Sequence, residues 1–177
     1  MINDQETAQQ SLCLSCGLCC DGTIFGRVQL KADDILGPLK SGLIQIELKG
    51  TKTFFRQPCS AYRESCCQIY EDRPTNCRDY RCELLKKYEA QVVTWEDAQE
   101  KIRRARKLRE EISATLRRLT PGRDDMSISA VLKIVPSPEE LRRDQTLLKK
   151  WGSTLLPLSA LLDCLQSHFK SRKSLPE

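Results

Sequence analysis

The chain has 177 residues, of which 30% are charged and 6% aromatic, and its formal net charge is +5 at pH 7. This length and a mean hydropathy of −0.47 suit one domain, alone or with an extension, and no apolar run reaches the roughly 18 residues that a membrane-spanning helix needs. The first residues carry neither the basic nor the apolar segment of a secretory signal, so we expect a cytoplasmic protein with reduced cysteines and no membrane partner.

Cysteines and charges are both distributed unevenly along the chain. Nine of the ten cysteines lie between Cys13 and Cys82, and the tenth is Cys164. Residues 1–90 carry 12 Lys and Arg against 12 Asp and Glu, whereas residues 91–177 carry 17 against 12. We therefore expect three parts: a disordered tail over 1–11, a cysteine-cluster metal-binding module over 12–90, and a helical extension over 91–177 packed on it.

The elements expected in the first half are short. They follow from β-branched and aromatic runs, from turn residues between apolar segments, and from a proline that suits a first helical turn. In chain order we expect a strand over 23–30, a short helix over 31–36, a hairpin from 43–48 and 53–55, a cysteine-bearing loop over 58–67, a strand over 68–70, and a helix from 74 to about 88.

The second half is expected to be helical. Thr94 is predicted to cap a helix, with Asp97 three residues later in the position of a capping box. Apolar residues then recur at helical spacing as far as Leu119. Segment 127–135 fits either a helix or a strand, Pro138 opens another helix, and a last helix is expected over about 155–169. Short strands followed by long helices predict an α+β protein.

The cysteine spacing predicts a metal site. Cys13, Cys16 and Cys19 form two overlapping C-x2-C steps, and Gly17 helps such a knuckle to fold. Two cysteines at this spacing can turn both sulfurs toward one ion, as in zinc ribbons and iron–sulfur sites. In a reducing compartment, cysteines at this density indicate metal binding rather than a disulfide framework.

A second group of cysteines can complete the coordination. Cys19 and Cys20 are adjacent, and neighbouring side chains usually diverge, so the two either serve different ions or one of them packs without binding. Four thiolates complete a tetrahedral site. The second group supplies Cys59, Cys66, Cys67, Cys77 and Cys82.

Three stretches of the sequence together resemble a known family. The string CLSCGLCC over 13–20, a Pro-Cys pair at 58–59, and the string CQIYEDRPTNCRDYRC over 67–82 resemble the CxxCxxCC family, the YkgJ-like cysteine-cluster proteins, whose domain is described as zinc- or iron-chelating. The resemblance covers about residues 12–88. It implies metal ligands at Cys13, Cys16, Cys19, Cys20, Cys59, Cys67, Cys77 and Cys82.

The resemblance leaves other properties open. Cys66 lies beside the pattern and looks like an extra cysteine. A similar module is associated with flagellin lysine methylases, but this sequence lacks a Gly-rich loop for a methyl donor, so methylation is not carried over. The cofactor is either zinc or an iron–sulfur cluster. Both leave an anionic thiolate site, and Arg73, Arg78 and Arg81 are placed among the ligands to offset that charge.

Other features support alternative hypotheses. Residues 101–118 carry eight basic and two acidic side chains, which suits nucleic acid or an acidic partner, but an apolar stripe and few aromatics make nucleic acid a minor hypothesis. Cys66 beside Arg63 suits a thiol-redox enzyme, although the chain's one histidine, His168, lies far along the sequence.

We expect a carrier, sensor or assembly factor without catalytic residues, with a protein partner for the helical half as a further hypothesis.

Overall fold

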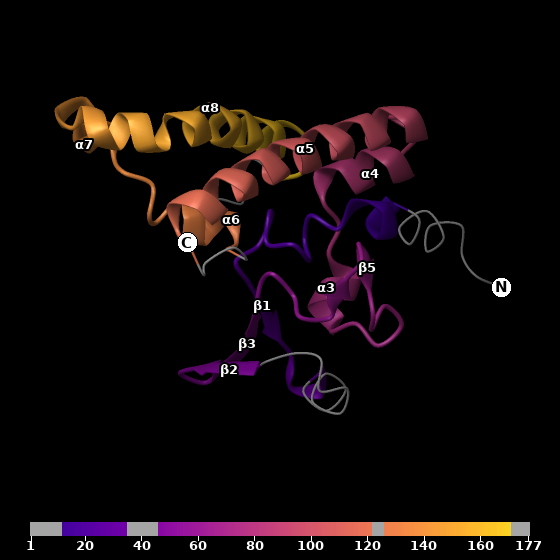
Figure 1. Cartoon of the computed structure of the whole chain (residues 1–177). Helices are drawn as coiled ribbons and strands as arrows, with labels where there is room; N and C mark the ends of the chain where they lie inside the picture. Colours follow the sequence, from indigo (N-terminus) through magenta and orange to yellow (C-terminus); the bar gives the residue numbers. More distant parts are fainter. Residues whose placement is uncertain (1–11, 35–45, 122–125, 171–177) are drawn as a thin grey trace.

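The computed structural model describes residues 12–34, 46–121 and 126–170. Within these ranges it confirms the α+β class: short antiparallel strands in the first half and long helices in the second. Figure 1 shows α4, α5 and α8 as one layer of helices, with the three-stranded sheet below it in this view. The expected tail over 1–11 lies outside the described residues.

The main sheet has the antiparallel order β1-β3-β2, formed by β1 (Arg27–Leu30), β2 (Ile46–Lys49) and β3 (Lys52–Arg56). The predicted β2–β3 hairpin is confirmed over its described part, while residues 43–45 lie outside it. The strand predicted over 23–30 is shorter than expected. Its first residues turn instead, because Thr23 N donates to Asp21 Oδ1 at 2.8 Å and Ile24 N to the Leu18 carbonyl at 2.9 Å.

Two other predictions for the first half need correction. The helix expected over 31–36 is a 3-10 turn, η1 (Ala32–Asp34), in its described part, and residues 35 and 36 lie outside the described residues. The strand expected over 68–70 is wrong: the extended pair is β4 (Tyr62–Arg63) with β5 (Cys66–Cys67). The turn between them has Glu64 and Ser65 at φ of 51° and 62°, the conformation of a tight hairpin turn. Because this turn contains only two residues, the second strand begins at Cys66, earlier in the sequence than predicted.

The single helix predicted from Pro74 to Tyr88 is also wrong. The structure has two helices, α3 (Thr75–Asp79) and α4 (Glu83–Glu89), separated by extended backbone at Tyr80 and Cys82. A continuous helix would place Cys77 and Cys82 about 140° apart around its axis. The break therefore lets α3 and α4 orient Cys77 and Cys82 independently of each other.

The helices of the second half are α5 (Trp95–Leu119), α6 (Ile128–Val131), α7 (Pro138–Arg143) and α8 (Gln145–His168). The capping box of Thr94 with Asp97 and the start at Pro138 are confirmed. α8 begins about ten residues before the predicted position, because Asp144 caps it by accepting from Thr146 N at 2.7 Å. The helix continues through Pro157. None of the described helices is long and apolar enough to cross a membrane.

Buried side chains form two separate clusters. The helix core joins Leu12, Leu18 and Ile24 from the first half to the facing sides of α4, α5 and α8. Among the described residues, the sheet core is small and consists of Leu30, Phe55, Cys59, Ala61 and Ile69. Since the helix core includes Leu12, Leu18 and Ile24, the start of the cysteine-rich module and the helical half are packed together.

Candidate metal centre

A cavity of about 480 Å³ lies between the helix core and the sheet core. All eight cysteines that the family resemblance implied as ligands line it: Cys13, Cys16, Cys19, Cys20, Cys59, Cys67, Cys77 and Cys82. The other two cysteines do not line it. Cys66 is exposed on β5, and Cys164 is buried on α8.

The thiols line the cavity without forming a closed site. Across the described ranges, no group of three or more His, Cys, Asp or Glu side chains is arranged to hold a metal ion as it stands. Zinc–sulfur bonds are about 2.3 Å long. Coordination therefore requires the thiols to move inward around the metal.

The first cysteine segment is shaped by Gly17. Residues 12–16 are helical, and Gly17 then reverses the chain with φ of +69°. Its amide donates to the Cys13 carbonyl at 3.2 Å, and its own carbonyl accepts from Cys20 N at 2.8 Å. A Cβ at Gly17 would overlap the phenol of Tyr62 from β4. The knuckle thus depends on glycine both for its φ and for the close approach of β4.

Backbone hydrogen bonds join the first segment to the loop that carries the later cysteines. Cys59 N donates to the Cys20 carbonyl at 2.7 Å, and Tyr62 N donates to the Cys59 carbonyl at 2.9 Å. Gln68 N then donates to the Ala61 carbonyl at 2.8 Å. These contacts hold Cys20, Cys59 and Cys67 around one side of the cavity.

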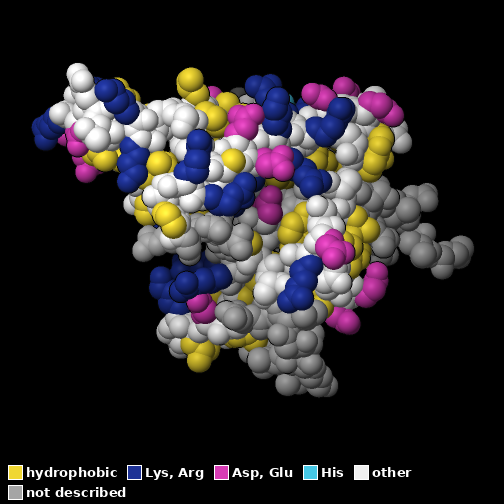
Figure 2. All heavy atoms as spheres, in the orientation of Figure 1, with side chains coloured by type: hydrophobic (Ala, Val, Ile, Leu, Met, Phe, Trp, Pro, Cys, Tyr) yellow, Lys and Arg dark blue, Asp and Glu magenta, His cyan; other side chains and the backbone are white. Residues whose placement is uncertain are grey.

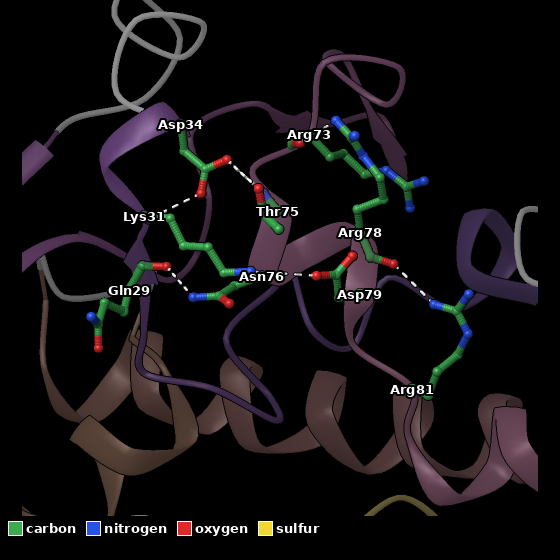
Figure 3. A network of polar contacts seen from close by, with 9 residues as sticks. All are labelled: Gln29, Lys31, Asp34, Arg73, Thr75, Asn76, Arg78, Asp79 and Arg81. Atoms are coloured by element: carbon green, nitrogen blue, oxygen red, sulfur yellow. Dashed lines mark hydrogen bonds and ion pairs between the residues drawn. The ribbon is translucent and has the colours of Figure 1, made fainter.

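α3, which carries Cys77, is anchored to the end of β1 (Figure 3). Asp34 Oδ1 accepts from Thr75 N at 2.8 Å and from Thr75 Oγ1 at 2.6 Å. Asn76 Nδ2 donates to the Gln29 carbonyl at 2.6 Å. Pro74, the N-cap of α3, makes no side-chain cap, so Asp34 supplies the acceptor for the first amide of the helix.

We expect Asp34→Ala to lower the free energy of unfolding by about 1 kcal/mol, the usual cost of losing a side-chain cap. Burial opposes ionisation of Asp34, but hydrogen bonds from Thr75 and from Lys31 N outweigh it and lower the pKa of this carboxyl. Because the folded pKa lies below the unfolded one, the contribution is present above about pH 4 and is lost as pH falls through the folded pKa.

Urea denaturation at pH 7 and pH 3 measures this effect. Asp33→Ala is the matched control, because Asp33 is exposed in the same turn. Equal destabilisation by the two substitutions would contradict the anchoring role of Asp34.

Burial keeps the cavity thiols protonated in the absence of a cation. Desolvation, with further repulsion from Cys82, raises the pKa of Cys13 to about 11. Desolvation, with repulsion from Cys59 and Cys67, raises the pKa of Cys77 to about 12. The pKa values of the other six cavity cysteines are also raised, with desolvation as the largest cause. A bound metal must displace these protons, so its affinity rises with pH.

Backbone amides are already aimed at several sulfurs. Leu18 N bonds to Cys16, Ala61 N to Cys59 and Ile69 N to Cys67, and each bond favours the thiolate. Cys82 caps α4, where its Sγ accepts from Leu85 N at 3.4 Å. Such N–H donors offset the negative charge of metal-bound thiolates.

The three arginines expected to offset the thiolate charge occupy different positions. Arg73 lines the cavity, and its positive charge partly offsets the rise that burial causes in the pKa values of Cys13, Cys67 and Cys77. Its guanidinium lies 3.5 Å from the Tyr70 ring centre, and its Nε donates to the Tyr70 carbonyl at 2.7 Å.

Arg81 has a smaller effect than Arg73 on the pKa of Cys13, and it forms an ion pair with Glu89 at 3.3 Å. Arg78 does not line the cavity, and it donates to the Arg73 carbonyl at 3.0 Å. Figure 3 shows Arg78 between the other two. Among the three, Arg73 is therefore best placed to stabilise bound thiolates.

The thiol-redox and nucleic-acid hypotheses concern Cys66 and the basic segment 101–118, whose arginines have partners of their own. Cys66 pairs with Arg63 across the β4–β5 ladder, but Arg63 Nε donates to the Ser60 carbonyl at 3.3 Å. In the basic segment 101–118, Arg109 is buried and donates to the Met126 carbonyl at 2.6 Å. Figure 2 shows Lys and Arg interspersed with Asp and Glu over the visible face. Nucleic-acid binding by this segment stays a minor prediction.

Sequence reasoning missed the position of Arg106. It extends from α5 to the cysteine-rich half, where its guanidinium donates to the Ser15 carbonyl and to Ser65 Oγ, each at 3.2 Å. It thus links the first cysteine segment to the β4–β5 turn. Several other arginines and lysines lie close to it in the sequence of the same basic helix, so no local signal distinguishes it.

We expect Arg106→Ala to lower the free energy of unfolding by about 1 kcal/mol, the net value of such hydrogen bonds. Arg103→Ala is the control, because Arg103 is exposed and pairs only with Glu100 three residues earlier among the contacts described. Thermal denaturation of both variants compares them, and an Arg106 effect no larger than that of Arg103 would exclude the link.

One comparison with known proteins gives a match. The model of the CxxCxxCC family, described as a putative zinc- or iron-chelating domain, matches residues 12–108. No curated protein and no solved structure matches the chain. The match includes every cavity cysteine and extends into α5 as far as the turn that carries Arg106.

Proposed function

Because the chain belongs to the CxxCxxCC family of zinc- or iron-chelating domains, we propose that it binds metal through the eight thiolates that line the cavity. The main support is that these eight cysteines, from five separate segments, surround one cavity while Cys66 and Cys164 do not. These thiols stay protonated when no cation is bound, and a metal that displaces the protons converts them to the thiolates that coordination requires.

The donor set fits two kinds of cofactor. Four thiolates complete tetrahedral zinc, and four thiolates also hold a [4Fe–4S] cluster. Arg73 and the amides of Leu18, Ala61 and Ile69 would offset the negative charge of either. Our proposal is therefore a thiolate site for zinc or for an iron–sulfur centre.

The proposed role is to hold metal rather than to catalyse a reaction. A site closed by four protein thiolates has no open position for a substrate. We propose that the protein acts as a metal carrier, a sensor or an assembly factor in the cytoplasm, with the helical half available to a protein partner.

Elemental analysis with an absorption spectrum, on protein purified without oxygen, tests the proposal. Zinc in a colourless protein, or iron with sulfide and a broad absorption band, supports it and identifies the metal. Cys66→Ser and Cys164→Ser are controls that should keep the wild-type metal content. Protein that holds no zinc or iron, even after reconstitution with either, would refute the proposal.

A further inference from the structure

The cavity cysteines pack against two different cores. Four of them contact the helix core, and we call these the helix-side set: Cys13, Cys16, Cys19 and Cys82. The other four belong to the sheet core or pack against it, and we call these the sheet-side set: Cys20, Cys59, Cys67 and Cys77. No cavity cysteine contacts both cores in the described part of the chain.

The helix-side set is held by the helical half of the protein. Leu12 and Leu18, which directly precede Cys13 and Cys19, are 2% and 0% exposed within the helix core. Its fourth member, Cys82, is the N-cap of α4. The next residue is fixed to the end of α8, because Glu83 N donates to the Phe169 carbonyl at 3.2 Å.

The sheet-side set is held by the sheet and its loops. The hydrogen bond from Cys59 N to the Cys20 carbonyl joins two of its members directly. Cys67 lies on β5, which pairs with β4 beside Cys59. Cys77 lies on α3, which Asp34 and Gln29 fix to the end of β1. None of these contacts involves a member of the helix-side set.

The division falls between two adjacent residues. Cys19 packs on the helix core and Cys20 on the sheet core, as expected for neighbouring side chains that point apart. Each set then contains four thiols, the number that closes a tetrahedral site. No thiol is left over, and none has to be shared.

Resting on the metal-binding function proposed above, we propose that the cavity holds two separate four-thiolate metal sites, with Cys19 and Cys20 as ligands of different sites. One divalent ion bound by four thiolates would leave each site with a net charge of −2. Arg73 is placed to stabilise both, since it lines the cavity and its charge acts on Cys13 of one set and on Cys67 and Cys77 of the other.

Pairs of substitutions distinguish two sites from one shared cluster. Each variant is reconstituted with zinc alone and exposed to a chelator at a concentration that leaves the wild-type zinc in place, and bound zinc is counted by native mass spectrometry. We expect two ions per chain in the wild type and in the Cys66→Ser and Cys164→Ser controls.

Same-set and cross-set pairs should then differ. Cys16→Ser with Cys19→Ser should keep one ion, and so should Cys20→Ser with Cys59→Ser. The adjacent pair Cys19→Ser with Cys20→Ser should keep none, because each site loses a ligand, which lowers its affinity by at least the roughly 10–100-fold cost of losing an outer-sphere partner. Retention of one ion by the adjacent pair, or of none by a same-set pair, would overturn the proposal.

A measurement on the wild type does not depend on the folding of variants. Zinc is withdrawn by increasing chelator, free thiols are alkylated, and the labelled positions are mapped. Two sites predict chains that keep one ion and carry label on all four cysteines of one set, besides Cys66. Chains that pass directly from two ions to none would overturn the two-site inference, whereas a wild type that takes up no zinc or iron at all would refute the metal-binding function itself.

Discussion

Removal of the metal is expected to unfold the cysteine-rich half while α5 and α8 stay helical. Among the described residues the sheet core has five buried side chains, one of them Cys59, and a core of that size cannot offset the conformational entropy of the segments that it orders. Structural metal sites contribute on the order of 10 kcal/mol to folding. Among the described residues the helix core is several times larger, and its one buried cysteine, Cys164, is not a predicted ligand and lies outside the cavity.

Hydrogen exchange before and after chelation measures this difference. Amides of β3, β4 and β5 should lose most of their protection in the apo protein, whereas those in the middle of α5 and α8 should keep theirs. Adding zinc or iron back to the same sample is the control and should restore protection. Unchanged protection of β3 after complete metal removal would contradict a folding role for the metal.

Gly17→Ala is expected to be the most destabilising single substitution outside the cysteines that we consider. Gly17 has φ of +69°, and a Cβ there would overlap Tyr62. An alanine therefore meets both backbone strain of about 1–3 kcal/mol and a steric overlap that forces β4 away from the knuckle, for about 1–3 kcal/mol more. Metal affinity should fall as well, because β4 leads to Cys66 and Cys67.

Gly50→Ala is the matched control for that substitution. Gly50 also has a positive φ, +60°, but nothing lies within 4 Å of the position where its Cβ would be. We expect Gly50→Ala to lower the free energy of unfolding only by the backbone strain, and to leave the metal content unchanged. Chemical denaturation and zinc counting compare the two variants, and equal losses of stability would show that the contact with Tyr62 is unimportant.

The sequence was sufficient to predict features that depend on local patterns. The capping box at Thr94 and the apolar stripe of α5 predicted a helix that the structure contains. The hairpin of β2 and β3 followed from two apolar segments around a turn. The resemblance to the CxxCxxCC family also selected the eight cysteines that line the cavity and left out Cys66.

The features that sequence reasoning missed depend on contacts between distant segments. The interruption at Tyr80 has no local signal such as glycine or proline, and it serves to direct Cys82 toward the cavity. α8 continues through Pro157 because Thr154, Leu158 and Leu161 pack in the interior on both sides of it. The division between Cys19 and Cys20 likewise follows from two cores that only the folded chain contains.

X-ray absorption at the metal edge of the purified protein tests the central claim, that the cavity thiolates bind the metal. Our account predicts a first coordination shell made only of sulfur, with about four atoms per metal at roughly 2.3 Å for zinc, and the same shell in the Cys66→Ser variant. A first shell of oxygen or nitrogen, or one that changes when Cys66 is replaced, would contradict it.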